Sequence, residues 1–358
     1  MSKYFEKMKE KFEFLRNKED VYILSIESSC DETSIAIVKN GREVLSNIIA
    51  TQIEIHKRFG GVVPEVASRN HILAISNVYE EALEKAGIKA EELDAIAVTY
   101  GAGLIGALLV GVNFAKTLAL SLNIPLIAVS HVHGHIASNY ISHLDLKPPF
   151  VCLMVSGGHT AILKINNYCN FELIGSTVDD AVGECFDKVA RVLGLEYPGG
   201  PNIDRLAKLG NNNIKFNYSC ALKDSYNFSF SGLKTAVVNY VHNKEQKKEE
   251  ISVEDIACSF QEIVTDELSE KAIKACKEFG LNKLVVAGGV GANSRLKEKL
   301  TTLCNENSIE LYSPILRYCT DNAGMIASAA YYYMKANIGL SDLDLTAKPN
   351  VPFILNID

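Results

Sequence analysis

The sequence predicts a duplicated α/β fold with two similar lobes, and two repeated patterns carry this prediction. Residues 21–48 and 149–177 each contain three apolar runs separated by polar turns, as in successive β-hairpins. Residues 93–130 and 281–313 each contain an apolar run, a glycine turn, a helical pattern and a second apolar run. Strand–helix–strand units pack as parallel neighbours with the helix on a sheet face. We therefore expect a mixed sheet in each half and a cleft between the halves.

Proline and composition divide the chain into four segments. Pro148 and Pro149 interrupt any helix near the middle of the chain and mark the boundary between the halves. We expect an N-terminal extension at 1–20, an N-terminal lobe at 21–147, a C-terminal lobe at 148–340 and a tail at 341–358. The extension mixes charged and aromatic residues, which predicts a short amphipathic helix. Two facing lobes suggest a ligand held between them.

Two segments of the second half carry local signals of their own. Ser252 with Asp255 three positions later predicts the start of a helix, and Gly280 predicts its end. The charged run at 242–250 predicts a solvated loop. These signals concern local structure and say nothing about function.

The composition is typical of a globular protein of the cytoplasm. Of 358 residues, 47% are hydrophobic and 22% are charged, which allows a large core. The N-terminus lacks the pattern of a signal peptide, and we expect no segment to span a membrane. The nine cysteines form no C-x-x-C pair and are best explained as reduced core thiols. We therefore expect a cytoplasmic protein with no membrane partner.

The net charge of −7 argues against a surface that grips nucleic acid by bulk electrostatics. A nucleic-acid partner would need a local basic patch or a second protein that supplies one. One candidate patch is present in the segment HKRFGGVVPEVASRNH and consists of His56, Lys57, Arg58, Arg69 and His71. Taken alone, such a patch is more often an ordinary exposed helix face and loop.

Three histidines within five positions, in SHVHGHIASNY, raise the question of a metal site. His131 and His135 are spaced i, i+4, so a helix places them on one face, about 5–6 Å apart at Cβ. His133 would point to another side. A catalytic metal usually takes three protein ligands and keeps one position open. On these residues alone, a metal site and a metal-free polar helix start remain equally open.

Residues 101–106, GAGLIG, match the dinucleotide-binding fingerprint G-x-G-x-x-G between a predicted strand and a predicted helix. That fingerprint also requires an acidic residue at the end of the following strand, to hold a ribose hydroxyl. The strand here ends in Ser130 and His131, which offer no acid. The sequence therefore disfavours a nicotinamide or flavin enzyme.

Three other turns favour a nucleotide ligand. The segment SIESSCDETS places Ser28, Ser29, Asp31 and Thr33 in a hairpin turn, where hydroxyls and backbone N–H groups could meet a phosphate. The segments VSGGHT and AGGVGAN offer glycine backbone at a second hairpin turn and at a helix start. Together they resemble the actin, sugar-kinase and Hsp70 ATPase superfamily, which shares a duplicated core.

Ten stretches, taken together, resemble one family within that superfamily, the tRNA adenosine threonylcarbamoyltransferases, once described as glycoproteases. In chain order they are IESSCDETS, GGVVPEVASRNH, GALLVGVNFAK, HVHGHI, VSGGHT, GECFDKVAR, YPGGPNID, FSFSGLKTAV, AGGVGAN and CTDNAGMIA. The resemblance runs in order from about residue 21 to 335, nearly the whole chain. One departure is Ala102, where the family usually has proline, and this change removes no ligand.

The resemblance implies a defined reaction. A threonylcarbamoyl group passes from threonylcarbamoyl-adenylate to N6 of adenosine 37, beside the anticodon, in tRNAs that read codons beginning with A. The implied partners are tRNA, a paralogous subunit and a small ATPase.

The resemblance also implies the residues of the site. One metal would be bound by His131, His135 and Asp321, with Fe(II) expected and Zn(II) a substitute. Asp321 could otherwise be an N-cap for the helix that follows. The implied donor-binding residues are Met154, Val155, Ser156, Gly157, Gly158, Asp187, Gly200, Asp204 and Asn293. Without the family, Asp187 and Asp204 would be taken for surface carboxylates. Asp31 or Glu32 could remove the proton of the attacking amine, with Asp31 the candidate we name.

Two other enzyme classes remain as alternatives. A metalloprotease is suggested by H-x-x-x-H, but that motif needs Glu directly after the first histidine, and Val132 stands there. A kinase or ATPase of the same superfamily would not need two histidines beside the cleft.

Overall fold

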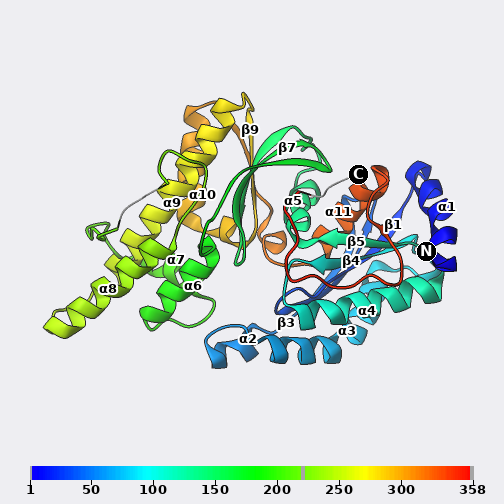
Figure 1. Ribbon diagram of the computed structural model, residues 1–358, viewed down its shortest axis with the longest axis horizontal. Coiled ribbons are helices and arrows are strands. Elements are labelled where there is room, and N and C mark those ends of the chain that lie inside the picture. The colour runs from blue at the N-terminus through cyan, green and yellow to red at the C-terminus, as the bar shows by residue number, and fades with distance from the viewer. Residues whose placement is uncertain (1, 219–221, 355–358) are drawn as a thin grey trace.

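The computed structural model describes residues 2–218 and 222–354 and contains two sheets of matching topology (Figure 1). The first sheet has the strand order β11-β5-β4-β1-β2-β3 and the second the order β10-β9-β6-β7-β8. In each, a three-stranded antiparallel meander continues through its first strand into two parallel strands. The predicted duplication is therefore confirmed, because β1 to β5 repeat as β6 to β10.

The strands follow the predicted apolar runs. Those of the first sheet are β1 (Tyr22–Glu27), β2 (Glu32–Lys39), β3 (Glu43–Thr51), β4 (Ala95–Gly101), β5 (Leu126–Ser130) and β11 (Leu340–Ser341). Those of the second are β6 (Phe150–Val155), β7 (Thr160–Asn167), β8 (Asn170–Ser176), β9 (Lys283–Ala287) and β10 (Glu310–Tyr312). The central strands β1 and β6 are buried along nearly their whole length, since helices cover both faces of each sheet.

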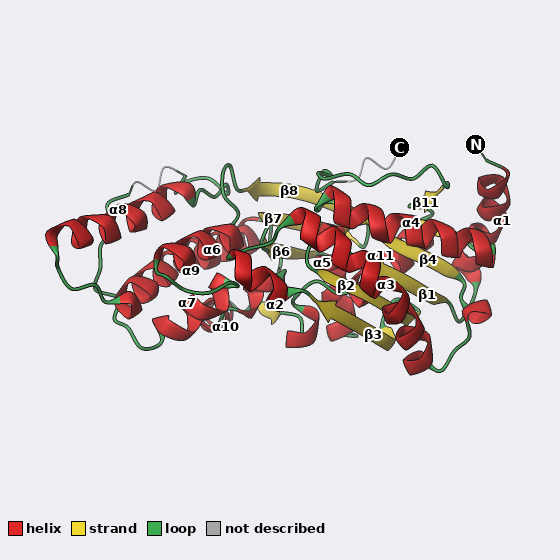
Figure 2. Cartoon of the chain, turned by 90° about the horizontal axis from the view of Figure 1, so that it is seen from below, coloured by secondary structure: helices red, strands yellow, loops and turns green. Residues whose placement is uncertain are grey.

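The helices form layers on these faces (Figure 2). The helices of the first half are α1 (Lys3–Asn17), α2 (Ile53–His56), α3 (Pro64–Ala86), α4 (Ile105–Leu122) and α5 (His131–Ser142). Those of the second half are α6 (Val182–Val192), α7 (Gly199–Ala207), α8 (Ser231–Lys247), α9 (Val253–Glu278), α10 (Ser294–Glu306) and α11 (Ala323–Lys335). Short 3-10 turns cover Lys57–Phe59, Ala90–Glu92, Gly289–Ala292 and Leu316–Tyr318.

One hydrophobic cluster joins the two sheets and fixes where the site lies. It contains residues of both sheets together with residues of α5 and α11, such as Ile136 and Met325. Helices α3 and α4 cover the other face of the first sheet, and α6 to α10 surround the other face of the second. Helix α11 falls within the range 148–340 expected for the second lobe, yet it packs on α5, β1 and β2. Strand β11 likewise extends the first sheet beside β5.

Several local expectations can be compared with the structure. The predicted N-terminal helix is present as α1 and buries Tyr4, Met8, Phe12 and Leu15 on one face. Helix α9 begins as predicted, with Ser252 Oγ accepting from the N–H of Asp255. The loop predicted at 242–250 was wrong, because α8 continues to Lys247. Lys, Glu and Gln are good helix formers, so an exposed charged run can stay helical.

Helix α4 is longer and more continuously apolar than we expected of any segment of this chain. It is long and apolar enough to cross a membrane by length and composition, a test that core helices of globular proteins also pass. One of its faces is buried against the first sheet through Leu108 and Val112, and Lys116 binds the carbonyl of Leu345. Its opposite face leaves Leu109 and Leu120 exposed.

Candidate metal centre

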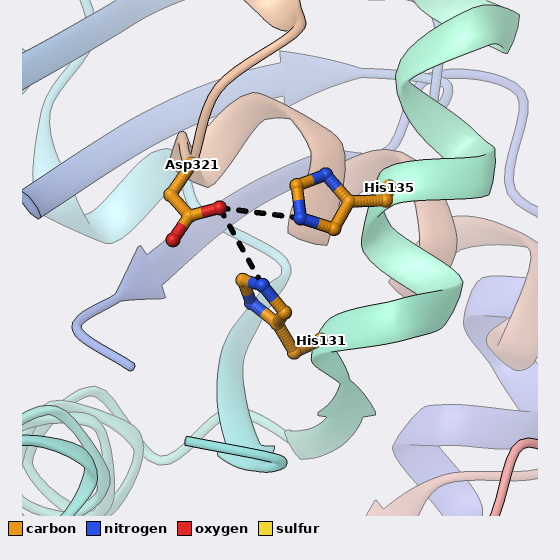
Figure 3. Close-up of side chains that lie close together, drawn as sticks. All are labelled: His131, His135 and Asp321. Atoms are coloured by element: carbon orange, nitrogen blue, oxygen red, sulfur yellow. Dashed lines mark ion pairs between the residues drawn. The ribbon is translucent and has the colours of Figure 1, made fainter. Parts of the chain in front are cut away.

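The two histidines of one helix face converge with an aspartate from a distant loop (Figure 3). Strand β5 ends at Ser130 and α5 begins at His131, so His131 and His135 occupy its first and second turns. Asp321 Oδ1 lies 3.4 Å from His131 Nε2 and 3.2 Å from His135 Nε2. One ligand atom from each residue lies within 4.8 Å of the others. This spacing fits three ligands of one metal ion.

Asp321 is free for this role because its neighbour caps the helix. The side chain of Asn322, not Asp321, accepts the N–H of Met325 at the start of α11. The alternative role of Asp321 as an N-cap is therefore wrong. Asn322 holds the helix start, and the preceding residue projects into the site.

Glu27 lies behind the first histidine and was not found from the sequence. Its Oε2 is 3.1 Å from His131 Nδ1 and accepts the hydroxyl of Thr99, while its Oε1 accepts the N–H of Ser29. Burial alone would lower the pKa of His131, but the carboxylates of Asp321 and Glu27 outweigh it and raise the pKa to about 9. A carboxylate on the far nitrogen fixes the orientation and tautomer of a metal-ligating histidine.

The polar groups of the cluster fit a cation. His135 Nδ1 is buried without a hydrogen bond to any described residue, which is costly unless another group satisfies it, and its Nε2 faces the carboxylate of Asp321. Burial raises the pKa of Asp321, but His131 and His135 hold it well below its usual range, so the carboxylate stays charged. Two imidazoles and one carboxylate form a donor set used by Fe(II), and zinc accepts the same ligands.

His133 points away from the cluster, as its spacing predicted. Its Nδ1 accepts the hydroxyl of Tyr333 and its Nε2 donates to the carbonyl of Phe353. Burial lowers the pKa of His133 to about 4, which keeps the ring neutral. His133 therefore joins α5 to the C-terminal tail.

The hydroxyls of the first hairpin turn form hydrogen bonds with other residues of the chain and do not face solvent. The hydroxyl of Ser28 donates to Ala107 O, that of Ser29 lies 3.2 Å from His131 Nδ1, and that of Thr33 lies 2.7 Å from His71 Nδ1. The expectation that these hydroxyls are open to a phosphate was therefore wrong. Through Ser29 the turn instead contacts His131 of the candidate metal centre.

The two acids of this turn differ in environment. Asp31 is nearly buried, and the hydroxyl of Tyr197, from the second lobe, donates to its Oδ2 over 3.5 Å. Burial, with the charges of Asp31 and Asp321, raises the pKa of Glu32. A raised pKa means that the Glu32 carboxyl keeps its proton at neutral pH.

The second hairpin turn leaves backbone open beside the metal helix. Met154 and Val155 are buried in β6. Two hydrogen bonds close the turn: Ser156 N–H donates to His159 O, and His159 N–H donates to Ser156 Oγ. Gly157 and Gly158 are exposed, and no described atom lies within 4 Å of a Cβ built on either. Backbone N–H groups at such a turn can approach an anion closely.

The other expected donor-binding residues gather around the starts of α7 and α10, which the side chains of Asp187 in α6 and Asp204 in α7 reach. Asp187 accepts the N–H of Gly199 at the start of α7, one residue before Gly200, and burial raises its pKa. Asp204 accepts the N–H and hydroxyl of Ser294 at the start of α10, and Asn293 is the N-cap of that helix. Asp187 and Asp204 are thus partly buried and hydrogen-bonded, unlike free surface carboxylates.

The apparent dinucleotide fingerprint has another explanation. A Cβ atom at Gly101 would lie 2.5 Å from Lys348 O, and one at Gly103 would lie 2.6 Å from Ser29 O. Gly103 also has φ +155°, which side chains rarely adopt. These glycines admit the C-terminal tail and the first hairpin turn of the same chain.

Only part of the expected basic patch is on the surface. His56 and His71 are buried, which corrects their assignment to it. The ammonium of Lys57 pairs with Glu54 and the guanidinium of Arg69 pairs with Glu65. Nearby, Arg191 of the second lobe donates to the carbonyl of Gly60. A cavity of about 180 Å³ lies between the lobes here, lined by Lys57, Gly60, Asp187, Arg191, Gly194, Leu195, Glu196, Tyr197 and Gly199.

Comparison with known proteins gives consistent results. The sequence model of the family described as tRNA N6-adenosine threonylcarbamoyltransferase matches residues 43–328. Proteins of that name from Clostridioides difficile strain 630 and Clostridium perfringens strain 13 are 56% and 57% identical over 333 and 331 residues. The aligned regions cover 93% and 92% of this chain and 98% and 97% of those proteins.

Solved structures of lower identity share the fold. HypF from T. kodakarensis matches with a TM-score of 0.60 at 14% identity, over 89% of this chain and 48% of HypF. Component A of the (R)-2-hydroxyglutaryl-CoA dehydratase of Acidaminococcus fermentans matches with a TM-score of 0.51 at 15% identity, over 88% of this chain and 98% of that one. These likenesses confirm the duplicated α/β core and carry no argument about activity.

Proposed function

The chain belongs to the tRNA N6-adenosine threonylcarbamoyltransferase family, and we propose that it transfers the threonylcarbamoyl group of threonylcarbamoyl-adenylate to N6 of adenosine 37 in tRNAs that read codons beginning with A. The observation that carries this proposal is a cation-compatible cluster at the start of α5 in the same interlobe region as an open glycine turn. An acyl-adenylate has a carbonyl that a cation can polarise and a phosphate that an anion-binding turn can receive, so both features suit it.

We propose that His131, His135 and Asp321 hold one divalent metal per chain, with Fe(II) preferred and Zn(II) a substitute. When bound, such a metal supplies a Lewis acid that can polarise a carbonyl of the donor. Glu27 holds the ring of His131 in place for this purpose. In a His135→Ala variant, metal content should fall sharply while the fold persists, and a His242→Ala variant, altered at an exposed histidine, should keep its metal. Full occupancy in His135→Ala would contradict the assignment.

The donor would lie in the interlobe cleft, against five consecutive residues of β6 and its turn. We propose that the backbone of Gly157 and Gly158 receives its phosphate or acyl end, with Met154, Val155 and Ser156 shaping that region. The nucleotide part would lie nearer Asp187, Gly200, Asp204 and Asn293. Partial burial of Asp187 and Asp204 supports this, because both acids line helix starts and not open surface.

The proposed transfer needs no covalent enzyme intermediate. The N6 amine forms a bond to the carbamoyl carbon, the bond from that carbon to the phosphate oxygen breaks, and AMP leaves with the electron pair. The amine also loses a proton, and we propose Asp31 as the acceptor. Glu32 is unsuitable because its raised pKa keeps it protonated. Positioning and charge stabilisation remain the main tasks of the protein.

The partners are proposed on two surfaces. Helices α3 and α4 form an apolar groove of about 580 Å³, lined by Ser68, Ile72, Ile75, Gly106, Leu109, Val110, Asn113, Phe114 and Thr117. Ile72 and Leu73 are 63% and 75% exposed, which is unusual for residues of this size. We propose that the paralogous subunit binds here and that the small ATPase completes the complex. The tRNA would approach along Lys57, Arg58 and Arg69.

We also propose that the lobes divide near residue 148, between the extension at 1–20 and the tail at 341–358, and that the protein works in the cytoplasm without a membrane partner. The packing of α4 on the first sheet supports the last point, because this helix is the one long and apolar enough to be considered as a membrane span among the described residues.

One experiment tests the proposed reaction. The metal-loaded chain, with its two partner proteins, is incubated with threonylcarbamoyl-adenylate and tRNA, and the nucleosides are analysed by mass spectrometry. The expected product is threonylcarbamoyl-adenosine at position 37, absent when the donor is omitted. A kinase or ATPase would instead consume ATP without modifying tRNA, and a protease would cleave peptide.

A further inference from the structure

The C-terminal tail is bound along its length to the first lobe. After β11, Asp342 accepts the N–H of Ser2 and Leu345 O accepts the ammonium of Lys116. Lys348 N–H then donates to Tyr100 O, and Pro349 O accepts the N–H of Gly103. In Figure 1 the tail, in red, passes over the first lobe and ends near the middle of the molecule. Two side-chain and two backbone hydrogen bonds therefore fix its route.

The end of the described tail reaches the helix that carries two metal ligands. His133 lies between His131 and His135 on α5, and its Nε2 donates to Phe353 O over 2.8 Å. Because the ring of His133 is fully enclosed and also bonded to Tyr333, this contact has a defined geometry. The backbone of Phe353 is thereby held against the metal-binding helix.

The ring of Phe353 contacts the glycine turn. It meets the ring of His159 edge to face, with centroids 5.5 Å apart and planes at 82°. His159 closes that turn, because its N–H donates to Ser156 Oγ and its carbonyl accepts the N–H of Ser156. The backbone of Phe353 is therefore hydrogen-bonded to α5, and its ring packs against the turn.

The turn itself needs such support. Gly157 and Gly158 have no side chains, and a Cβ at either would meet no described atom within 4 Å. Glycine backbone is conformationally permissive, so ordering it on ligand binding costs free energy. A brace that holds the turn in one conformation before binding reduces that cost.

We propose that Phe353 is a positioning residue of the transferase reaction, whose ring holds His159 and the turn at 156–159 in the conformation that receives the donor. This inference rests on the proposed function, because it assigns the donor to that turn. Phe353 acts through His159 and does not itself touch the reacting atoms. The tail thus links the metal-binding helix to the donor-binding turn.

The test compares variants of the full-length, metal-loaded chain in the complete complex. In Phe353→Ala the backbone carbonyl that binds His133 remains and only the ring is removed. We expect KM for threonylcarbamoyl-adenylate to rise about three- to tenfold, as expected for the loss of one edge-to-face pair, with kcat changed less than about twofold. Phe353→Tyr keeps the ring and should have the KM of the original protein. Metal content and the melting temperature should stay near those of the original protein.

Ile354→Ala is the matched control, since Ile354 is the exposed neighbour on the same tail. It should leave KM unchanged. An unchanged KM in Phe353→Ala, an equal rise in Ile354→Ala, or a failure of Phe353→Tyr to restore KM would each overturn the inference. If Phe353→Ala is too unstable to assay, Phe353→Leu keeps the apolar bulk and must still raise KM. A wild-type complex that makes no modified nucleoside would instead refute the proposed function, which separates the two failures.

Discussion

His131 Nδ1 lies 3.1 Å from Glu27 Oε2, so one candidate metal ligand is held from behind by a buried carboxylate. The opposite nitrogen of the same ring faces Asp321. Glu27 is itself bound by Thr99 and by the backbone of Ser29, which leaves its carboxylate little freedom. The ring can therefore present only its Nε2 to a cation.

Loss of this carboxylate should weaken metal binding. A Glu27→Gln variant keeps the shape of the side chain but removes the charge that orients His131. Partners of this kind typically contribute about 10- to 100-fold in metal affinity, so the affinity measured by competition with a chelator should fall by that amount. Glu32→Gln is the control, because Glu32 keeps its proton already and its variant should bind metal normally. Equal affinities in both variants would rule out the role of Glu27.

The sequence predicted the two sheets, and it predicted that His131 and His135 lie on one helix face, because both signals are local. Hairpins repeat at short range, and the i, i+4 spacing of His131 and His135 follows from helix geometry. Asp321 came only through the family resemblance, since nothing in its neighbourhood marks it as a ligand. Glu27 was missed because it lies 104 residues from His131 in the chain and looks like any acid at a strand end.

The glycines at 101–106 also show that contacts between distant segments cannot be predicted from local patterns. GAGLIG fits a dinucleotide pattern, but what Gly101 accommodates is Lys348, which no local pattern could pair with it. The buried state of His71 likewise depends on packing of α3 against the first sheet, and that of His56 on its contacts with Gln52 and Val63. Short-range patterns predicted the elements, whereas the contacts between distant segments needed the structure.

The metal-free protein should become less stable as the pH rises. The folded-state pKa of His131 is raised to about 9, above its ordinary value, because Asp321 and Glu27 favour the charged ring. Its stabilising contribution, on the order of 3 kcal/mol, is therefore fully present below about pH 6.5 and is lost between about pH 6.5 and 9. Thermal unfolding of chelator-treated protein across this range measures the effect. Asp321→Asn removes the main favourable charge and should flatten the profile, and an identical profile would contradict this origin.

A side chain at the glycine turn should block the donor without disturbing the fold. A Cβ at Gly157 has open space around it, so Gly157→Val should fold, while its branched side chain fills the space that the donor would enter. We expect at least about a tenfold loss of affinity for AMP or a stable adenylate analogue, measured by calorimetry. Gly232→Val, at another open glycine far along the chain in α8, is the control for any general effect. Unchanged affinity in Gly157→Val would remove the turn from the donor site.

A charge in the apolar groove should prevent the binding that we propose for the paralogous subunit. Ile72→Glu places a carboxylate in the groove between α3 and α4, where binding would strip it of water. Complex formation measured by size-exclusion chromatography should be lost, while metal content stays constant. Leu209→Glu alters an equally exposed residue of the second lobe and should leave the complex intact. A stable complex with Ile72→Glu would place the subunit elsewhere.

The basic residues near the cavity between the lobes should contribute to tRNA binding in a salt-dependent way. Lys57 is paired with Glu54, so Arg58 is the cation in this segment for which no ion pair is present in the described structure. Removing one cation that binds a phosphate should reduce the slope of log affinity against log salt by about 0.7 to 0.9. The double variant Lys57→Glu, Arg58→Glu should therefore bind tRNA more weakly and with a flatter salt dependence. The double variant Lys215→Glu, Lys223→Glu, at exposed lysines of the second lobe, controls for the change in net charge, because each double variant lowers that charge by four. If the double variant modifies tRNA as well as the original at near-physiological salt, the RNA follows another path across the protein.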